Sequence, residues 1–246
     1  MIDRRNGKQM SLINDFQCEL RVILENLNSD ENREELKQKN IIPDTQNTHN
    51  SGQTFESYIL LDCLAPRFDL KKLDLTTKQK KKFDSRATAK CDIYKGSFNG
   101  KVVYVIDLPK QTPDFIIILG DHVIDFYLET KSIFSNSSQP KMNAGLNNPE
   151  KTHRTLYLVY KQNENRVIIR HGTQVLSEEG VKAIKKITEL QEQFVKSQYA
   201  ILSEANLKYQ PALRFEFDIP EDWEYCKEKE KEALDIFFKG GLKKDV

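Results

Sequence analysis

Short runs rich in isoleucine, valine and aromatic residues follow one another in the middle of the chain, and they limit most strongly what it can fold into. The runs are KVVYVIDL, DFIIIL, HVIDFYLET, TLYLVYK and RVIIRHG, all between residues 101 and 172. This length and composition predict β-strands. Several runs are apolar on both faces, as are strands in a sheet that is covered on both sides. The sequence therefore predicts a central mixed β-sheet.

Patterns typical of helices flank these runs. Apolar residues recur at helical spacing within residues 11–37, and a second helix is expected at about 54–65, ending before Pro66. An amphipathic helix is expected from Ser177 towards Asn206, with acidic residues in its first turn. Helices on both sides of a sheet give an α/β fold class.

The C-terminal region adds a strand and a helix. Residues 213–219, LRFEFDI, alternate between apolar and polar side chains, which predicts a strand. Pro220 then opens a last helix that ends at Gly240-Gly241. We expect one domain over residues 1–246, made of a helical N-terminal segment (1–50), a core (54–165) and C-terminal helices and strand (177–246).

Composition excludes several classes of protein. The 38 Lys and Arg residues nearly balance 37 Asp and Glu residues, so the chain is neither a blanket polycation nor an acidic tail. No apolar segment approaches the roughly 18 residues of a membrane span, and the N-terminus is too polar for a signal peptide. The four cysteines form no CxxC pair. We expect a cytoplasmic protein with free thiols and no membrane partner.

Two acids and a lysine within residues 112–132 form the sharpest local pattern. We expect the two runs of this segment to form a hairpin with a two-residue loop at 120–121. Glu129 is then the diagonal neighbour of Asp114, with a Cα separation of roughly 7–8 Å. Lys131 lies on the same face, about 6.6 Å beyond Glu129.

That spacing suits a metal-dependent reaction at a phosphate. Two carboxylates at this distance can hold one Mg²⁺, which prefers oxygen ligands. A neighbouring ammonium, Lys131, can orient a water and stabilise charge on an attacked phosphate. Asp125 shares the face but lies about 13 Å from Glu129, so we assign it a structural role. The alternative is an ordinary turn at Pro113-Asp114 and an exposed ion pair of Glu129 with Lys131.

The sequence Pro113-Asp114 followed by Glu129-Thr130-Lys131 resembles the PD-(D/E)XK signature of the nuclease superfamily that includes the type II restriction endonucleases. The resemblance covers roughly residues 54–165 and implies a restriction-endonuclease-like catalytic core. It also implies Mg²⁺-dependent hydrolysis of double-stranded DNA at a specific short sequence, leaving 5′-phosphate ends. By this resemblance Asp114, Glu129 and the Thr130 carbonyl bind the metal, and Lys131 positions the attacking water.

Glu56 is a second acidic candidate. On a helical wheel it lies among Ile59, Leu60 and Cys63, an apolar stripe that a carboxylate should avoid. The resemblance implies that a glutamate of the first core helix lies near the metal. The alternative is that Glu56 only complements the N-terminus of its helix.

Two polar segments are candidates for DNA contact. Residues 71–90 concentrate lysine and arginine, which contact phosphates independently of sequence. Residues 132–154 are rich in Ser, Asn and Lys and leave the strand that carries Lys131. Either segment could equally be a solvated loop. The DNA-binding candidates are Lys80, Lys81, Lys82, Arg86, Ser132, Lys141, Asn143 and Asn147.

Three functions fit these observations. The first is a type II restriction endonuclease, expected as a homodimer because a two-fold protein suits a palindromic site, with a DNA methyltransferase as its genetic partner. The second is a repair or recombination nuclease of the same superfamily. The third is a non-catalytic DNA-binding protein whose acids and lysine only form a surface pair.

Overall fold

A seven-stranded mixed sheet is the centre of the computed structural model, which describes residues 4–41, 53–109, 113–120, 124–133, 149–204 and 224–240. The strands lie side by side in chain order, and every neighbouring pair is antiparallel except β5 and β6, which are parallel. They are β1 (Lys71–Lys72), β2 (Asp92–Phe98), β3 (Lys101–Asp107), β4 (Phe115–Leu119), β5 (Ile124–Ile133), β6 (Thr155–Lys161) and β7 (Arg166–His171).

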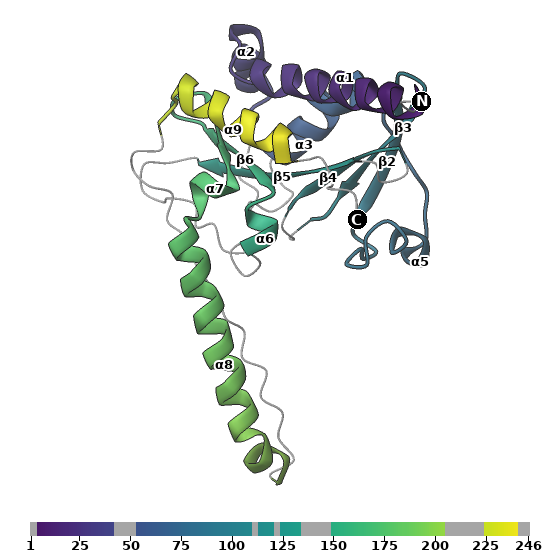
Figure 1. The fold of residues 1–246 in the computed structure, drawn as a ribbon. Helices are drawn as coiled ribbons and strands as arrows, with labels where there is room; N and C mark the ends of the chain where they lie inside the picture. Colours follow the sequence, from purple (N-terminus) through teal and green to yellow (C-terminus); the bar gives the residue numbers. More distant parts are fainter. Residues whose placement is uncertain are drawn as a thin grey trace.

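Helices flank this sheet, which confirms the predicted α/β class. In Figure 1, α1, α2 and α9 lie above the sheet, α5 and α6 lie below it, and α8 projects from the body. The helices are α1 (Arg4–Asn26), α2 (Asp30–Gln38), α3 (Phe55–Tyr58), the π-helical turn η1 (Ile59–Leu64), α4 (Ala65–Phe68), α5 (Thr77–Lys80), α6 (Pro149–Thr152), α7 (Gly172–Val175), α8 (Glu178–Glu204) and α9 (Lys227–Gly240). No helix in these described ranges is long and apolar enough to cross a membrane.

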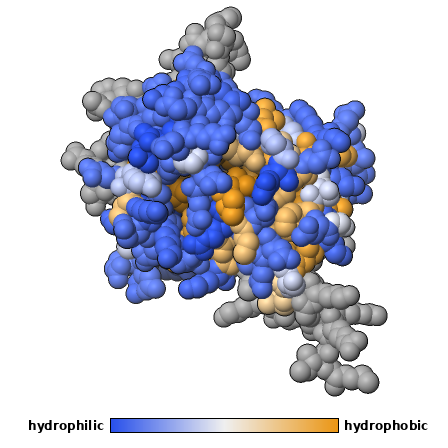
Figure 2. Space-filling model, turned by 90° about the horizontal axis from the view of Figure 1, so that it is seen from above, coloured by the Kyte–Doolittle hydropathy of each residue, from blue (hydrophilic) through white to orange (hydrophobic). Residues whose placement is uncertain are grey.

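The two faces of the sheet bury different side chains. Phe126 of β5 packs against Phe16 of α1 and Phe237 of α9, with ring centroids 6.1 and 5.4 Å apart. Tyr127 points to the opposite face, where it joins a smaller cluster with Ile116 and Ile118. Seen from the α1 and α9 side, the surface is largely hydrophilic with apolar side chains in a central band (Figure 2). Because side chains alternate along a strand, residues 129 and 131 share the face of Tyr127.

The N-terminal helices differ from the prediction in two places. The helical pattern of residues 11–37 is divided, because Ser29 caps α2 by accepting a hydrogen bond from the Asn32 amide at 3.2 Å. The helix that was expected to end before Pro66 continues to Phe68. Pro66 lies in the first turn of α4, directly after the π-helical turn, and a missing N–H is tolerated at such a position.

The hairpin register also differs from the prediction. β4 and β5 pair from Phe115 with Leu128 to Leu119 with Ile124, so the loop has four residues (120–123) and not two. A slip of two residues keeps every side chain on its predicted face, because the side-chain period of a strand is two. It brings Asp114 level with Glu129, where the prediction made them diagonal neighbours.

The C-terminal predictions have mixed outcomes. The strand expected at 213–219 lies outside the described residues. The last helix begins at Lys227, and residues 224–226 are not helical, so the prediction that Pro220 opens it is wrong. Arg170 donates a hydrogen bond to the Glu224 carbonyl at 3.0 Å, which ties this non-helical segment to β7. The helix predicted from Ser177 towards Asn206 is confirmed as α8.

Candidate active site

The candidate site is built at the point where β3 ends and β4 begins. The amide of Leu108 donates a hydrogen bond to the Asp114 carbonyl at 2.8 Å, which closes the turn between these strands. Because Phe115 pairs with Leu128, the residue before it is level with Glu129 on β5. Asp114 and Glu129 are both buried, with 7% and 3% of their surfaces exposed. The backbone therefore brings two carboxyl groups together in a desolvated place.

Thr130 fixes the carboxyl group of Asp114. The Thr130 amide and hydroxyl both donate hydrogen bonds to Asp114 Oδ2, at 2.7 and 2.9 Å. Two donors on one oxygen hold the carboxylate in one orientation, since either alone would leave it freer to rotate. Asp114 therefore has a defined direction even though it lies outside the strand ladder.

Lys131 spans the two acids. Its Nζ lies 2.5 Å from Glu129 Oε1 and 3.9 Å from Asp114 Oδ2. The side chain of Lys131 is 27% exposed, whereas those of the two acids are 9% exposed or less. The ammonium group therefore reaches buried carboxylates from the solvent side.

Burial is the largest influence on Asp114. It raises the pKa of Asp114, against the opposing effects of the Lys131 charge and of the two hydrogen bonds from Thr130. A carboxylate whose ionised form is still disfavoured after these contacts would be stabilised by a further positive charge. The electrostatics of the site thus favour binding of a cation.

Asp107 is a member of this region that the sequence analysis missed. It ends β3, its side chain is hydrogen-bonded to Glu56, and its Oδ1 is buried without a hydrogen-bond partner among the described residues. Burial and the charges of Asp92 and Asp114 raise the pKa of Asp107 to about 6. The sequence feature that could have identified Asp107 is an acid near the end of the apolar run KVVYVIDL.

The structure places Glu56 in the first turn of α3, as one interpretation required, and in contact with Asp107. A hydrogen bond between two carboxyl groups needs a proton on one of them, so this pair carries at most one negative charge while it is intact. Glu56 is therefore connected to the site by its hydrogen bond with Asp107.

The oxygen atoms present fit a hard divalent cation. Asp114, Glu129 and the Thr130 carbonyl provide oxygen donors, and none is a sulfur or nitrogen ligand. Within the described residues, no group of three or more His, Cys, Asp or Glu side chains is placed to hold a metal ion. Mg²⁺ is commonly held by one or two carboxylates together with waters and substrate phosphate oxygens, so two carboxylates are sufficient.

Tyr157 borders the site on the neighbouring strand β6. It pairs with Glu129 in the parallel ladder, and its hydroxyl is hydrogen-bonded to the side chain of Thr152 in α6. Burial, together with the charge of Glu129, raises the pKa of Tyr157, so this phenol stays protonated at neutral pH. Tyr157 therefore links the site to α6.

The predicted DNA-binding residues have different surroundings. Lys80 is 7% exposed, and its Nζ donates hydrogen bonds to the backbone carbonyls of Cys91 and Ala89, at 2.5 and 3.3 Å. This lysine holds a loop together and does not present its charge on the surface, contrary to the expectation for it. Lys81 and Lys82 are exposed.

Three of the remaining candidates lie in parts of the chain outside the described residues: Lys141, Asn143 and Asn147. Arg86 is half-buried and held by Asp84. Ser132 follows Lys131 on β5, and its buried hydroxyl oxygen has no hydrogen-bond partner within the part of the chain that the structure describes.

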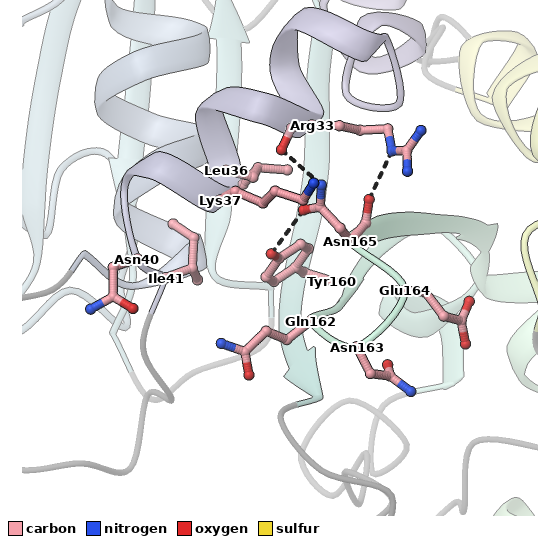
Figure 3. A pocket seen from close by; sticks show the side chains of 10 residues that line it. All are labelled: Arg33, Leu36, Lys37, Asn40, Ile41, Tyr160, Gln162, Asn163, Glu164 and Asn165. Atoms are coloured by element: carbon pink, nitrogen blue, oxygen red, sulfur yellow. Dashed lines mark hydrogen bonds between the residues drawn. The ribbon is translucent and has the colours of Figure 1, made fainter.

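A separate cavity of about 370 Å³ lies between the end of α2 and the turn from β6 to β7 (Figure 3). Asn165, at a φ of 49°, joins its walls: it donates to the Arg33 carbonyl at 2.8 Å and accepts from the Tyr160 hydroxyl at 3.1 Å. None of the residues that line this cavity belongs to the cluster around Asp114. The cavity is therefore distinct from the candidate site.

A scan against protein-family models and searches of curated proteins and of solved structures found no match to this chain.

Proposed function

We propose that this protein is a Mg²⁺-dependent nuclease that cleaves double-stranded DNA at a specific short sequence, in the manner of a type II restriction endonuclease. The observation that carries the proposal is the convergence of Asp114, Glu129 and Lys131 on one face of β4 and β5. The helix–strand order around them supports a restriction-endonuclease-like core. That order is a helix with Glu56, the antiparallel strands β1 to β5, and then β6, which is parallel to β5.

The acids and the backbone define where a cation would bind. Asp114 and Glu129 would hold Mg²⁺ together with the Thr130 carbonyl, and the ion would stabilise negative charge on the phosphate as a Lewis acid. The two hydrogen bonds from Thr130 keep Asp114 in its orientation throughout. Neither carboxylate has to be reoriented from a solvent-exposed rotamer before substrate binds.

Lys131 would act on the attacking water. Its ammonium group lies next to both carboxylates, and its partial exposure lets it reach a phosphate that approaches from solvent. An ammonium in this position can orient the water and stabilise charge on the phosphate oxygens. Attack of the water oxygen on phosphorus, with departure of the 3′ oxygen, leaves a 5′-phosphate and a 3′-hydroxyl end.

Burial is the observation that favours a catalytic site over a structural surface pair. A surface ion pair keeps its charges hydrated and contributes roughly 0–1 kcal/mol. Here two carboxyl groups are almost completely desolvated beside a single ammonium, an arrangement that costs free energy unless a cation or a proton balances it.

A cleavage assay tests the proposal. Purified protein is incubated with duplex DNA of mixed sequence and Mg²⁺, and parallel samples contain EDTA. We expect discrete fragments that disappear on chelation and in Lys131→Ala. Lys161→Ala is the matched control, because Lys161 is a strand lysine paired with Glu164, at 2.7 Å. Full cleavage by Lys131→Ala would refute the site.

The same gel separates the two nuclease proposals. Fragments of fixed length indicate recognition of a sequence, as for a restriction enzyme with a methyltransferase partner. Cutting that depends on ends or on DNA structure indicates a repair or recombination nuclease. Binding of DNA without any cleavage indicates the non-catalytic alternative.

A further inference from the structure

Two arginines lie near Tyr127, two residues before Glu129 on the same strand, and a lysine lies near one of them. The guanidinium carbon of Arg154 lies 4.7 Å from the centre of the Tyr127 ring. Arg86, from the loop after α5, is near enough for its charge to act on both Tyr127 and Lys151. We call Arg86, Lys151 and Arg154 the cationic cluster. Its members come from two segments that are more than sixty residues apart in the sequence.

Two carboxylates hold the arginines of the cluster in place. Asp84 accepts two hydrogen bonds from Arg86, at 2.9 and 2.7 Å, and Asp125 accepts one from Arg154 at 2.8 Å. The structural role expected for Asp125 is thus to orient an arginine. A guanidinium that is already ordered loses little conformational entropy when it binds a further anion.

Lys151 brings a third positive charge to the cluster. Burial and the nearby charge of Arg86 lower the pKa of Lys151, against the opposing charge of Asp84. A lysine in such surroundings would be stabilised by a bound anion, which relieves the repulsion between like charges.

The position of the cluster relates it to the candidate active site. Tyr127 and Glu129 point to the same face of β5, and their Cα atoms are about 6.6 Å apart at 3.3 Å per residue. The Cα atom of Lys131 lies about 13 Å from that of Tyr127, but its Nζ lies beside Glu129, at 2.5 Å. A linear polyanion with one phosphate at this ammonium group would therefore carry a nearby phosphate towards the cluster. The face of the sheet towards α1 and α9 is filled by the large apolar core, so only this face offers such a path within the described residues.

We propose that Arg86, Lys151 and Arg154 bind a backbone phosphate of DNA near the phosphate that is hydrolysed. The identity of the polyanion rests on the function proposed above, whereas the phosphate chemistry follows from the cluster itself. Contacts of this kind position the duplex and add affinity that does not depend on sequence.

The salt dependence of DNA binding tests this inference. Binding of a fluorescein-labelled duplex of mixed sequence is measured by anisotropy in EDTA, over a series of salt concentrations. Each lost phosphate contact lowers the slope of log K against log[salt] by about 0.9. We expect a partial loss for Lys151→Gln and a loss approaching about 0.9 for the double variant Lys151→Gln/Arg154→Gln, because the cluster binds one phosphate.

Matched variants keep the result interpretable. Lys37→Gln removes an exposed lysine of α2, paired with Glu34 at 3.0 Å and on the other side of the sheet, and should leave the slope unchanged. Lys151→Arg keeps the charge and should restore the wild-type slope. Circular dichroism confirms that each variant is folded.

The outcomes separate this inference from the proposed function. A reduced slope in the Lys151 variants supports the cluster even if wild-type protein fails to cut DNA with Mg²⁺, in which case only the nuclease proposal fails. If wild-type protein cuts DNA but the Lys151 variants bind it with an unchanged slope, only the proposal for the cationic cluster is overturned. Absence of any DNA binding overturns both.

Discussion

At the scale of single residues, the candidate site depends on how burial and charge are balanced at Asp114. Burial raises its pKa, while Lys131 and the two Thr130 hydrogen bonds act in the opposite direction. Thr130 controls both the orientation of this carboxylate and part of that balance, although the prediction gave a role only to its backbone carbonyl. The motif (D/E)XK accepts any residue at its central position, so it does not indicate a role for the hydroxyl of Thr130.

Thr130→Val removes the hydroxyl and keeps the shape of the side chain and the backbone amide. Loss of a hydrogen bond to a charged group costs about 1.5–3 kcal/mol of stability. Since this bond lowers the pKa of Asp114, its loss raises that pKa. We therefore expect the acidic limb of the pH–rate profile for cleavage to move to higher pH.

Thr188→Val is the control for this prediction, because Thr188 donates to the Ile184 carbonyl at 2.9 Å within α8. It should leave the pH–rate profile in place. An unmoved acidic limb in Thr130→Val, in a protein with normal circular dichroism, would show that the Thr130 hydroxyl does not tune Asp114.

The residue types and the face of the site were predictable, because alternation along a strand follows from period two alone. The distance between Asp114 and Glu129 was not, because it depends on the length of the hairpin loop. Asp107 was not identified as a site residue from the sequence, because an acid at the end of a strand is usually solvated. Only the three-dimensional turn between β3 and β4 brings Asp107 near Asp114.

At the scale of elements, close backbone contacts connect α6 to the sheet. A Cβ atom on Gly172, at the start of α7, would lie 1.6 Å from the Thr152 carbonyl oxygen of α6. Thr152 is in turn hydrogen-bonded to Tyr157, the ladder neighbour of Glu129. The approach of α7 to α6 therefore supports the position of Tyr157 beside the site.

Gly172→Ala tests this support. The added methyl group meets backbone atoms that cannot rotate away, so we expect a loss of at least about 2 kcal/mol in the free energy of unfolding. Cleavage should also fall at temperatures where the variant is folded. Urea unfolding and a cleavage assay measure the two effects.

Gly180→Ala provides the comparison, because a Cβ there would meet the tip of the flexible Leu176 side chain, at 2.7 Å. In α8 an alanine also gains about 0.5–1 kcal/mol of helix stability over glycine. If Gly172→Ala were as stable as Gly180→Ala, the close packing of α6 on α7 would be wrong.

The junction of α9 with β7 buries an acid whose ionisation should appear in stability. Burial raises the pKa of Glu230 to about 7, although Ile169, Arg170 and Asn28 partly stabilise its charge. The folded state then binds a proton that the unfolded state releases near pH 4.5. Stability contributed by protonated Glu230 is therefore present below pH 4.5 and is lost as pH rises to about 7.

Glu230→Gln should remove this loss. We expect the unfolding free energy of the variant, relative to wild type, to increase by about 2–3 kcal/mol between pH 4.5 and 7.5. Urea unfolding at several pH values gives this difference, in which the contribution of other titrating groups such as His171 cancels. A constant difference over this pH range would contradict the raised pKa.

Element types were largely predictable where apolar periodicity is strong, as in β3 to β7 and α8. Strand β2 was not predicted, because DIYKGSF contains a lysine and a glycine and lacks a clear pattern. A Cβ on Gly96 would lie 2.0 Å from the Phe68 carbonyl, so this glycine is required by the packing of α4 on β2. Gly96, a residue type that is typical of turns, is thus needed here for close packing between a helix and a strand.

At the scale of the whole molecule, near-neutrality conceals an uneven placement of charge. Acids of the candidate site and the cationic cluster lie beside one another on one face of the sheet. The opposite face is occupied by the apolar core beneath α1 and α9. The expected homodimer, the single-domain organisation and the cytoplasmic location stay predictions.

The most direct test of the central claim is the single-turnover rate of duplex cleavage with Mg²⁺ in wild type, Asp114→Asn and Asp62→Asn. Asp62 is the matched control, because its carboxylate also pairs with a lysine, Lys39, but lies on η1. We expect Asp114→Asn to lower the rate by about 10²–10⁴-fold and Asp62→Asn to leave it within a few-fold of wild type. Equal rates for wild type and Asp114→Asn, or cleavage that persists in EDTA, would contradict the account.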